Sequence, residues 1–165
     1  MPQFKLRQRL LAIGDDFDIS DANGVAVYKV DDRMFRLRQT WVIETLDGRE
    51  AITVRRKLVA VRKTAQLLRD GEVIATIRKA LIAPLRDRFM IDLEAGGDLE
   101  AKGNVLDHEY AISRDGTAVA QVSKRWFTIR DTYGVDIADG EDVELMLAIA
   151  VAIDDLAHEP DDDEG

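Results

Sequence analysis

Residues 143–153 read VELMLAIAVAI, and every position of this stretch after Glu144 is apolar. A helix with this sequence is hydrophobic around its whole circumference, so it must be enclosed by protein or by lipid. The unbroken apolar run 145–153 has nine residues, whereas a helix that crosses a bilayer needs about 20. The sequence therefore predicts a helix buried inside the protein and no transmembrane segment.

The residues around this helix predict where it begins and ends. Asp139 is a good N-cap residue, and Glu141 and Asp142 follow it, where the helix macrodipole favours negative charge. We expect the helix to begin at Asp139, to fray at residues 154–155 and to end before Pro160.

Six dipeptides typical of turns recur along the rest of the chain: Asn23-Gly24, Asp47-Gly48, Asp70-Gly71, Gly96-Gly97, Asp115-Gly116 and Tyr133-Gly134. Asn-Gly and Asp-Gly between β-branched runs indicate hairpins, because a type I′ turn needs positive φ at both central residues. The intervening segments alternate in polarity, as in Ile52 and Val54 followed by Arg56. The pattern predicts a meander of about ten to twelve short strands.

A long meander leaves exposed strand edges unless it closes on itself. Closure around the apolar helix would bury the helix and remove the edges together. The predicted fold is therefore mainly β with one α-helix: a closed antiparallel barrel that encloses the hydrophobic C-terminal helix.

Composition places the chain in the class of single globular domains. Its 165 residues, 46% of them hydrophobic, suffice for one core, and we assign residues 1–158 to this domain and residues 159–165 to a disordered acidic tail. The chain has no cysteine, which excludes disulfides, thiolate metal sites and cysteine nucleophiles. The basic N-terminus lacks the apolar core of a signal peptide, so a cytoplasmic location is expected, with peripheral membrane attachment as an open alternative.

Charge is distributed unevenly along the chain. The net charge is −9, yet residues 1–90 carry 18 Lys and Arg against 12 Asp and Glu, while residues 91–165 carry 5 against 20. Such blocks can complement each other inside one fold, or they can leave a basic face on an acidic protein. The acidic half, together with the absence of nucleic-acid-binding motifs, argues against a nucleic-acid partner.

The densest basic cluster is RRKLVAVRK at residues 55–63, whose basic members are Arg55, Arg56, Lys57, Arg62 and Lys63. As one strand, it would display basic side chains on both faces. The net charge of −9 favours a solvated strand face that pairs with acidic neighbours. The alternative is an anion-binding or lipid-binding patch, assisted by the basic residues within 78–88, because a basic residue near an anionic membrane contributes about 1 kcal/mol.

Other polar and aromatic groups predict no catalytic or metal site. The acidic series from Asp15 to Asn23 does not match the spacing of an EF-hand, and it reads as a polar strand leading into a turn. His108, between Asp107 and Glu109, makes a poor metal or triad set. We expect the aromatic residues Trp41, Trp126 and Phe127 to belong to the core, as aromatic residues on strands usually do, with a ligand slot or a membrane-inserting tip as the alternative.

Three segments resemble the LURP-one-related family: KRWFTIRDTYGVDIADGEDVELMLAIAVAIDDL (124–156), ISDANGVAVYKV (19–30) and DHEYAISRDGTAVAQVSKRW (107–126). The resemblance implies a closed barrel of about twelve strands threaded by a hydrophobic helix, the fold of the Tubby C-terminal domain and the phospholipid scramblases. Tubby domains bind phosphoinositides, but no functional motif of these relatives can be matched to residues of this chain.

We therefore expect a non-enzymatic, soluble binding protein without a cofactor or metal. Its barrel surface would engage an anionic lipid headgroup or another small ligand. The alternative function is a protein–protein interaction or scaffold domain without a small ligand.

Overall fold

The computed structural model describes residues 2–7, 17–32, 40–57, 64–80, 87–126 and 132–157. These residues form twelve strands and one helix. The elements are β1 (Gln3–Arg7), β2 (Phe17–Asp21), β3 (Ala26–Asp32), β4 (Thr40–Thr45), β5 (Glu50–Arg56), β6 (Thr64–Arg69), β7 (Glu72–Lys79), β8 (Asp87–Leu93), β9 (Leu99–Asn104), β10 (Glu109–Arg114), β11 (Thr117–Ser123), β12 (Thr132–Ile137) and α1 (Val143–Ala157).

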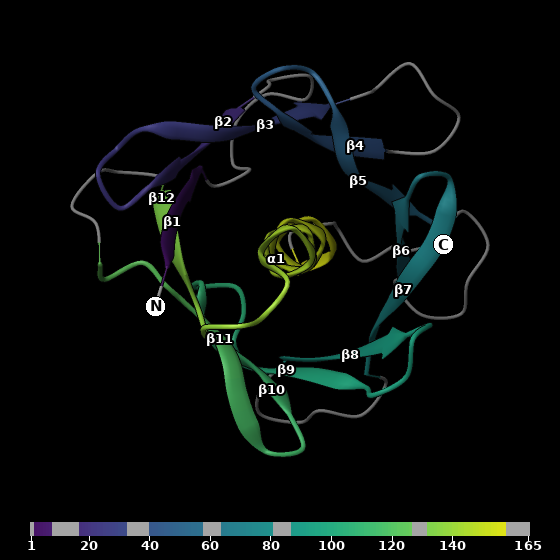
Figure 1. Cartoon of the computed structure of the whole chain (residues 1–165). Helices are drawn as coiled ribbons and strands as arrows, with labels where there is room; N and C mark the ends of the chain where they lie inside the picture. The colour runs from purple at the N-terminus through teal and green to yellow at the C-terminus, as the bar shows by residue number, and fades with distance from the viewer. Residues whose placement is uncertain are drawn as a thin grey trace, which may run out of the picture.

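The strands form one closed antiparallel barrel in which each strand pairs with its sequence neighbours. β1 completes the ring by pairing with β12 from Gln3↔Asp136 to Arg7↔Thr132, and it also pairs with β2. Figure 1 shows α1 lying along the middle of this ring. The predicted closed barrel around a hydrophobic helix is thus confirmed. Closure is favourable because it pairs the first strand with the last and leaves neither as an exposed edge.

The core lies between the helix and the inner faces of the strands. Alternate strand residues such as Ile52 and Val54 point inward and are almost fully buried. Every helix residue from Met146 to Leu156 is buried, and α1 contacts β5, β6, β7 and β12. A helix apolar on all sides suits this position because the barrel surrounds it with strands. Among the described residues, no helix is long and apolar enough to cross a membrane.

The backbone conformation of the residues at the turns determines the geometry of the hairpins. Asp70-Gly71 and Asp115-Gly116 have positive φ at both residues, as a type I′ turn requires. In the turns that contain Asn23-Gly24 and Asp47-Gly48, only the glycine has positive φ, and its N–H bonds to the carbonyl three residues before it. The prediction of a turn at Tyr133-Gly134 is wrong, because both residues lie inside β12 and Tyr133 is buried.

Because antiparallel strands alternate in direction, successive connections lie at opposite ends of the barrel. Short connections lie at one end, which we call the turn end: residues 22–25, 46–49, 70–71, 94–98, 115–116 and 138–142. At the opposite end, which we call the rim, β1–β2, β3–β4, β5–β6, β7–β8, β9–β10 and β11–β12 are connected. α1 begins at the turn end and ends at the rim.

Candidate functional site

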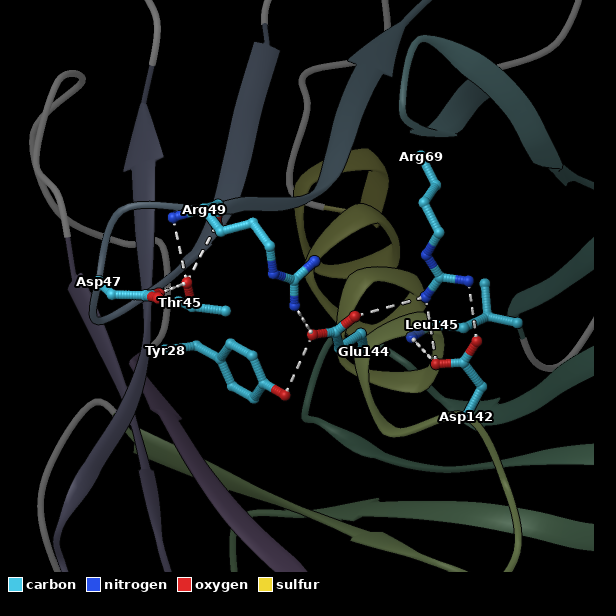
Figure 2. A network of polar contacts seen from close by, with 8 residues as sticks. All are labelled: Tyr28, Thr45, Asp47, Arg49, Arg69, Asp142, Glu144 and Leu145. Atoms are coloured by element: carbon cyan, nitrogen blue, oxygen red, sulfur yellow. Dashed lines mark hydrogen bonds and ion pairs between the residues drawn. The ribbon is translucent and has the colours of Figure 1, made fainter.

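Polar side chains from three strands or turns hold the start of the helix at the turn end (Figure 2). The Glu144 carboxylate accepts hydrogen bonds from Arg49 Nη2 at 3.0 Å and from the Tyr28 hydroxyl at 3.4 Å. Arg69 donates to both carboxylate oxygens of Asp142, at 3.0 and 3.2 Å, and lies 3.6 Å from Glu144. Burial and the charge of Glu144 raise the pKa of Tyr28. This network joins the helix to β3, the β4–β5 turn and β6.

The N-cap of the helix is Asp142, so the prediction of Asp139 is wrong. Asp142 Oδ1 accepts the Leu145 N–H at 3.2 Å, and the Asp142 carbonyl accepts the first helical bond, from Met146. Asp139 instead precedes Gly140, which has a φ of +86° in the turn that redirects the chain from β12 into the barrel.

At the rim, the helix is held by a buried ion pair. Arg56 donates from Nε and Nη2 to the two carboxylate oxygens of Asp155, each at 2.5 Å. The side chain of Asp155 is only 2% exposed and that of Arg56 17%, while the guanidinium lies 5.6 Å from the ring centre of Trp41. The predicted fraying at residues 154–155 is wrong, because α1 continues to Ala157 and both aspartates are buried.

A second buried pair lies beside it. His108 Nε2 lies 2.6 Å from Asp154 Oδ1, and the imidazole stacks on Tyr133 with ring centres 4.4 Å apart. The hydroxyls of Tyr110 and Tyr133 are buried and have no hydrogen-bond partner in the described part of the chain. Burial raises the pKa of both tyrosines well above 10, and the charge of Asp154 adds to the effect.

These contacts explain the uneven charge of the two halves. Arg49, Arg56 and Arg69 come from the basic first half, and their partners Asp142, Glu144 and Asp155 come from the acidic second half. The two blocks therefore complement each other within one fold. The sequence analysis did not predict these pairs. The signal for them was the presence of acidic residues at both ends of an enclosed helix, because a buried carboxylate needs a cationic partner and only the surrounding strands can provide one.

The predicted basic cluster does not form one strand. β5 ends at Arg56, and the Lys57 N–H donates to the Thr64 carbonyl at 3.0 Å, which closes the connection between β5 and β6. The prediction of a single strand over residues 55–63 is therefore wrong.

The basic residues of this cluster also face different surroundings. Arg56 points inward to Asp155, whereas Arg55 lies on the opposite face of β5 and donates to Gln66 at 3.0 Å. Lys57 is exposed at the rim. The remaining members, Arg62 and Lys63, lie outside the described residues.

The described part of the acidic series between Asp15 and Asn23 leads into a turn, as predicted. Asp21 Oδ1 accepts the backbone N–H groups of Asn23 and Val25, at 2.9 and 3.0 Å, so this carboxylate closes a turn. Asp15 and Asp16 lie outside the described residues, and within the residues that are described no group of acids and histidines could hold a metal ion.

The residues flanking His108 are used in other contacts. Asp107 accepts from Asn104 Nδ2 at 2.7 Å, and Glu109 accepts from Ser123 and from the Lys124 N–H.

The predicted aromatic set does not form one slot. Trp41 belongs to the core, whereas Trp126 is 37% exposed at the rim. Phe127 lies outside the described residues.

The two ends of the barrel differ in charge. By sequence, the connections of the turn end contain 8 acidic residues and 1 basic residue, whereas the strand connections of the rim contain 11 basic and 4 acidic residues. In the described part of the rim connections, Lys57 and Arg125 are exposed, and so is Leu106, at 52%.

Comparison with known proteins places this fold in a family. The LURP-one-related family matches residues 3–154. The chain is 23% identical over 163 residues to the uncharacterized protein YxjI of Bacillus subtilis, covering 99% of this chain and 98% of YxjI. It is 22% identical over 170 residues to Protein LURP-one-related 15 of Arabidopsis thaliana, covering 92% of this chain and 78% of that protein.

A solved structure supports the same fold. An X-ray structure of an Arabidopsis thaliana protein has a TM-score of 0.68 and 18% sequence identity, covering 94% of this chain and 91% of that one. The family match spans both the barrel and the enclosed helix, and this chain therefore belongs to the LURP-one-related family.

Proposed function

We propose that this LURP-one-related chain is a non-enzymatic binding protein whose rim engages an anionic ligand, with a lipid headgroup at a membrane surface as the leading candidate. The observation that carries the proposal is the separation of charge between the basic rim connections and the acidic turn end. A barrel with this polarity would present its rim to an anionic surface and keep its turn end away from it.

Exposed apolar side chains at the rim support the lipid version of the proposal. Trp126 and Leu106 are exposed, and Arg125, whose side chain is 84% exposed, adjoins Trp126. An aromatic ring beside a basic group suits the boundary between headgroups and acyl chains.

Arg56 is not part of the proposed surface, because its guanidinium is committed to Asp155. Of the predicted basic residues, Lys57 is retained. Arg62 and Lys63 remain sequence-based predictions.

The non-enzymatic assignment is part of the proposal. Its support is that the buried polar side chains of Arg56, His108, Asp154 and Asp155 are engaged in pairs between helix and barrel.

Vesicle co-sedimentation tests the proposal with neutral phosphatidylcholine vesicles and vesicles that also contain phosphatidylserine. We expect binding to the anionic vesicles only, reduced at least about tenfold by Lys57→Glu with Arg125→Glu, because two charges are reversed at about 1 kcal/mol or more each. The matched control adds the same negative charge to exposed turn-end positions, as Asn23→Glu, Leu46→Glu, Ala95→Glu and Thr117→Glu. Equal binding to both vesicle types, or equal loss in both variants, would refute a lipid-binding rim.

A protein partner is the second candidate, and one observation favours it. The outer face of β8, β9 and β10 has a depression of about 450 Å³ whose lining has three acidic residues, one basic residue and an exposed methionine: Asp98, Glu100, Asp115, Lys102 and Met90. These groups suit a basic side chain with an apolar stem. A pull-down partner that is lost with Asp98→Lys and Asp115→Lys but kept with Lys57→Glu would favour this function.

A further inference from the structure

We propose that Asn23 is a site of spontaneous covalent modification: its side-chain amide is lost through a succinimide, at a rate that the Asp21 carboxylate restrains. The inference concerns the β2–β3 turn and is independent of the proposed ligand. It draws on the Asn23-Gly24 dipeptide, on the exposure of the turn and on the hydrogen bonds that close it. The reaction consumes only water.

The reaction joins two groups that are adjacent in the chain. The backbone nitrogen of Gly24 bonds to Cγ of Asn23, the bond between Cγ and Nδ2 breaks, and ammonia leaves with the proton of the Gly24 N–H. Water then opens the cyclic succinimide at one of its two carbonyls. Opening at the side-chain carbonyl gives aspartate, whereas opening at the backbone carbonyl gives isoaspartate, in which the chain runs through the side-chain carbon.

The turn leaves both reacting groups accessible. Asn23 and Gly24 are exposed. Glycine has no side chain that would hinder the approach of its nitrogen to Cγ of Asn23. The hydrogen bonds that close the turn use the backbone N–H of Asn23 and not its side-chain amide. The amide is therefore open to attack when the turn rearranges.

Asn104, the other asparagine of the chain, has different surroundings. It is also exposed, but its Nδ2 donates to Asp107 at 2.7 Å and its Oδ1 accepts the Asp107 N–H at 3.3 Å. The next residue is Val105, whose buried, β-branched side chain crowds the nitrogen that would have to attack. Exposure does not separate the two asparagines, whereas the following residue and the side-chain hydrogen bonds do.

The hydrogen bonds of the β2–β3 turn restrain the reaction. The Gly24 N–H donates to the Asp21 carbonyl at 3.0 Å, so this nitrogen must be released before it can attack. Asp21 Oδ1 keeps the turn closed by accepting the N–H groups of Asn23 and Val25, at 2.9 and 3.0 Å. Because these bonds lie in an exposed turn, opening them costs much less than unfolding the barrel.

The β4–β5 turn repeats this arrangement with aspartate in place of asparagine. The Gly48 N–H donates to the Thr45 carbonyl at 3.0 Å, and Thr45 Oγ1 accepts the Arg49 N–H at 3.1 Å. Asp47 has the position of Asn23, and an ionised carboxyl group is a poor target for a nitrogen nucleophile. Asp47→Asn should therefore create a second reactive site in a turn with the same hydrogen bonds.

The modification changes the turn end of the barrel. Either product adds one negative charge, and isoaspartate also lengthens the backbone between Asp21 and Val25, which the Asp21 carboxylate now bridges. β3 begins at Ala26, and its Tyr28 bonds to Glu144 at the start of the helix. We expect isoaspartate, but not aspartate, to loosen this connection.

Incubation of the purified full-length protein in mildly alkaline buffer tests the proposal, with tryptic peptides analysed by mass spectrometry. We expect Asn23 to lose its amide at least about tenfold faster than Asn104, a ratio that corresponds to about 1.4 kcal/mol in the activation free energy. The products should include both aspartate and isoaspartate. Asp21→Ala should accelerate the reaction at Asn23 alone, and Asp47→Asn should add a second converted site.

Each part of the proposal has an outcome that would overturn it. Conversion of Asn23 no faster than that of Asn104 would remove the site. An unchanged rate in Asp21→Ala, with a circular dichroism spectrum like that of the wild type, would remove the restraint by Asp21. The isoaspartate form, isolated by chromatography, should unfold at a lower urea concentration than the Asn23→Asp variant, and equal midpoints would refute the loosening of the turn.

Discussion

Replacing Arg56 by methionine should be among the most damaging single changes at the rim. The substitution keeps an apolar stem of similar length but removes the guanidinium that neutralises Asp155, whose side chain is 2% exposed. Breaking a buried pair by removing one partner costs about 3–5 kcal/mol, and the lost contact with Trp41 adds about 0.5–1 kcal/mol. Because Arg56 is itself 17% exposed, we expect the lower part of this range, about 3–4 kcal/mol in the free energy of unfolding.

A double-mutant cycle distinguishes the pair from general packing. Arg56→Met with Asp155→Leu replaces both charges by apolar groups, so it should cost about 1.5 kcal/mol or less and give a coupling energy of at least about 2 kcal/mol. Arg55→Met is the matched control one residue away, since its guanidinium bonds to Gln66 on the other face of β5. That control should cost about 1 kcal/mol.

Urea unfolding followed by circular dichroism gives these values, provided that the m-value stays constant across the variants. If Arg56→Met costs no more than the Arg55→Met control, or if the two changes of the cycle are additive, then the pair does not hold the helix in the way the geometry indicates. A loss of about 3 kcal/mol is large against a total stability of about 5–15 kcal/mol.

Three further predictions concern the core, a close backbone contact and pH. Ile149→Asp places a charge at a fully buried helix position at a cost of several kcal/mol, so circular dichroism should show an unfolded chain, whereas Ile149→Val should stay folded; a soluble, folded Asp variant would contradict the enclosed helix. Gly103→Ala should cost at least about 2 kcal/mol in urea unfolding, because φ is +144° and the new Cβ would lie 2.6 Å from the Glu109 carbonyl oxygen; a cost under about 0.5 kcal/mol would argue against this approach of β9 to β10. The pKa values of Tyr110 and Tyr133 are raised well above 10 in the folded protein, so their contribution to stability should be complete below about pH 10 and should fall as pH rises toward the folded values. Absorbance at about 295 nm should show ionisation of these two tyrosines only as the protein unfolds, and titration of all three tyrosines in the native protein near pH 10 would refute the burial of Tyr110 and Tyr133.

Local patterns in the sequence determined the main architecture. The run 145–153 has no polar face, so burial on all sides was the only arrangement available to a helix too short for a membrane. Asp70-Gly71 and Asp115-Gly116 allow positive φ at both central positions, so their turns depend on only two residues each. These features act over short distances along the chain, and for that reason they can be read without a structure.

Contacts between distant segments were decided only by the tertiary structure. Arg56 and Asp155 are 99 residues apart, and nothing near Arg56 in sequence distinguishes it from Arg55, which strand alternation places on the opposite face. The same holds for His108, whose partner Asp154 comes from the helix, and for Tyr133, which is drawn into β12 although glycine follows it. The described basic residues of the cluster at 55–63, Arg55, Arg56 and Lys57, were therefore separated, because closing the barrel determined which side of β5 faces the helix and where that strand ends.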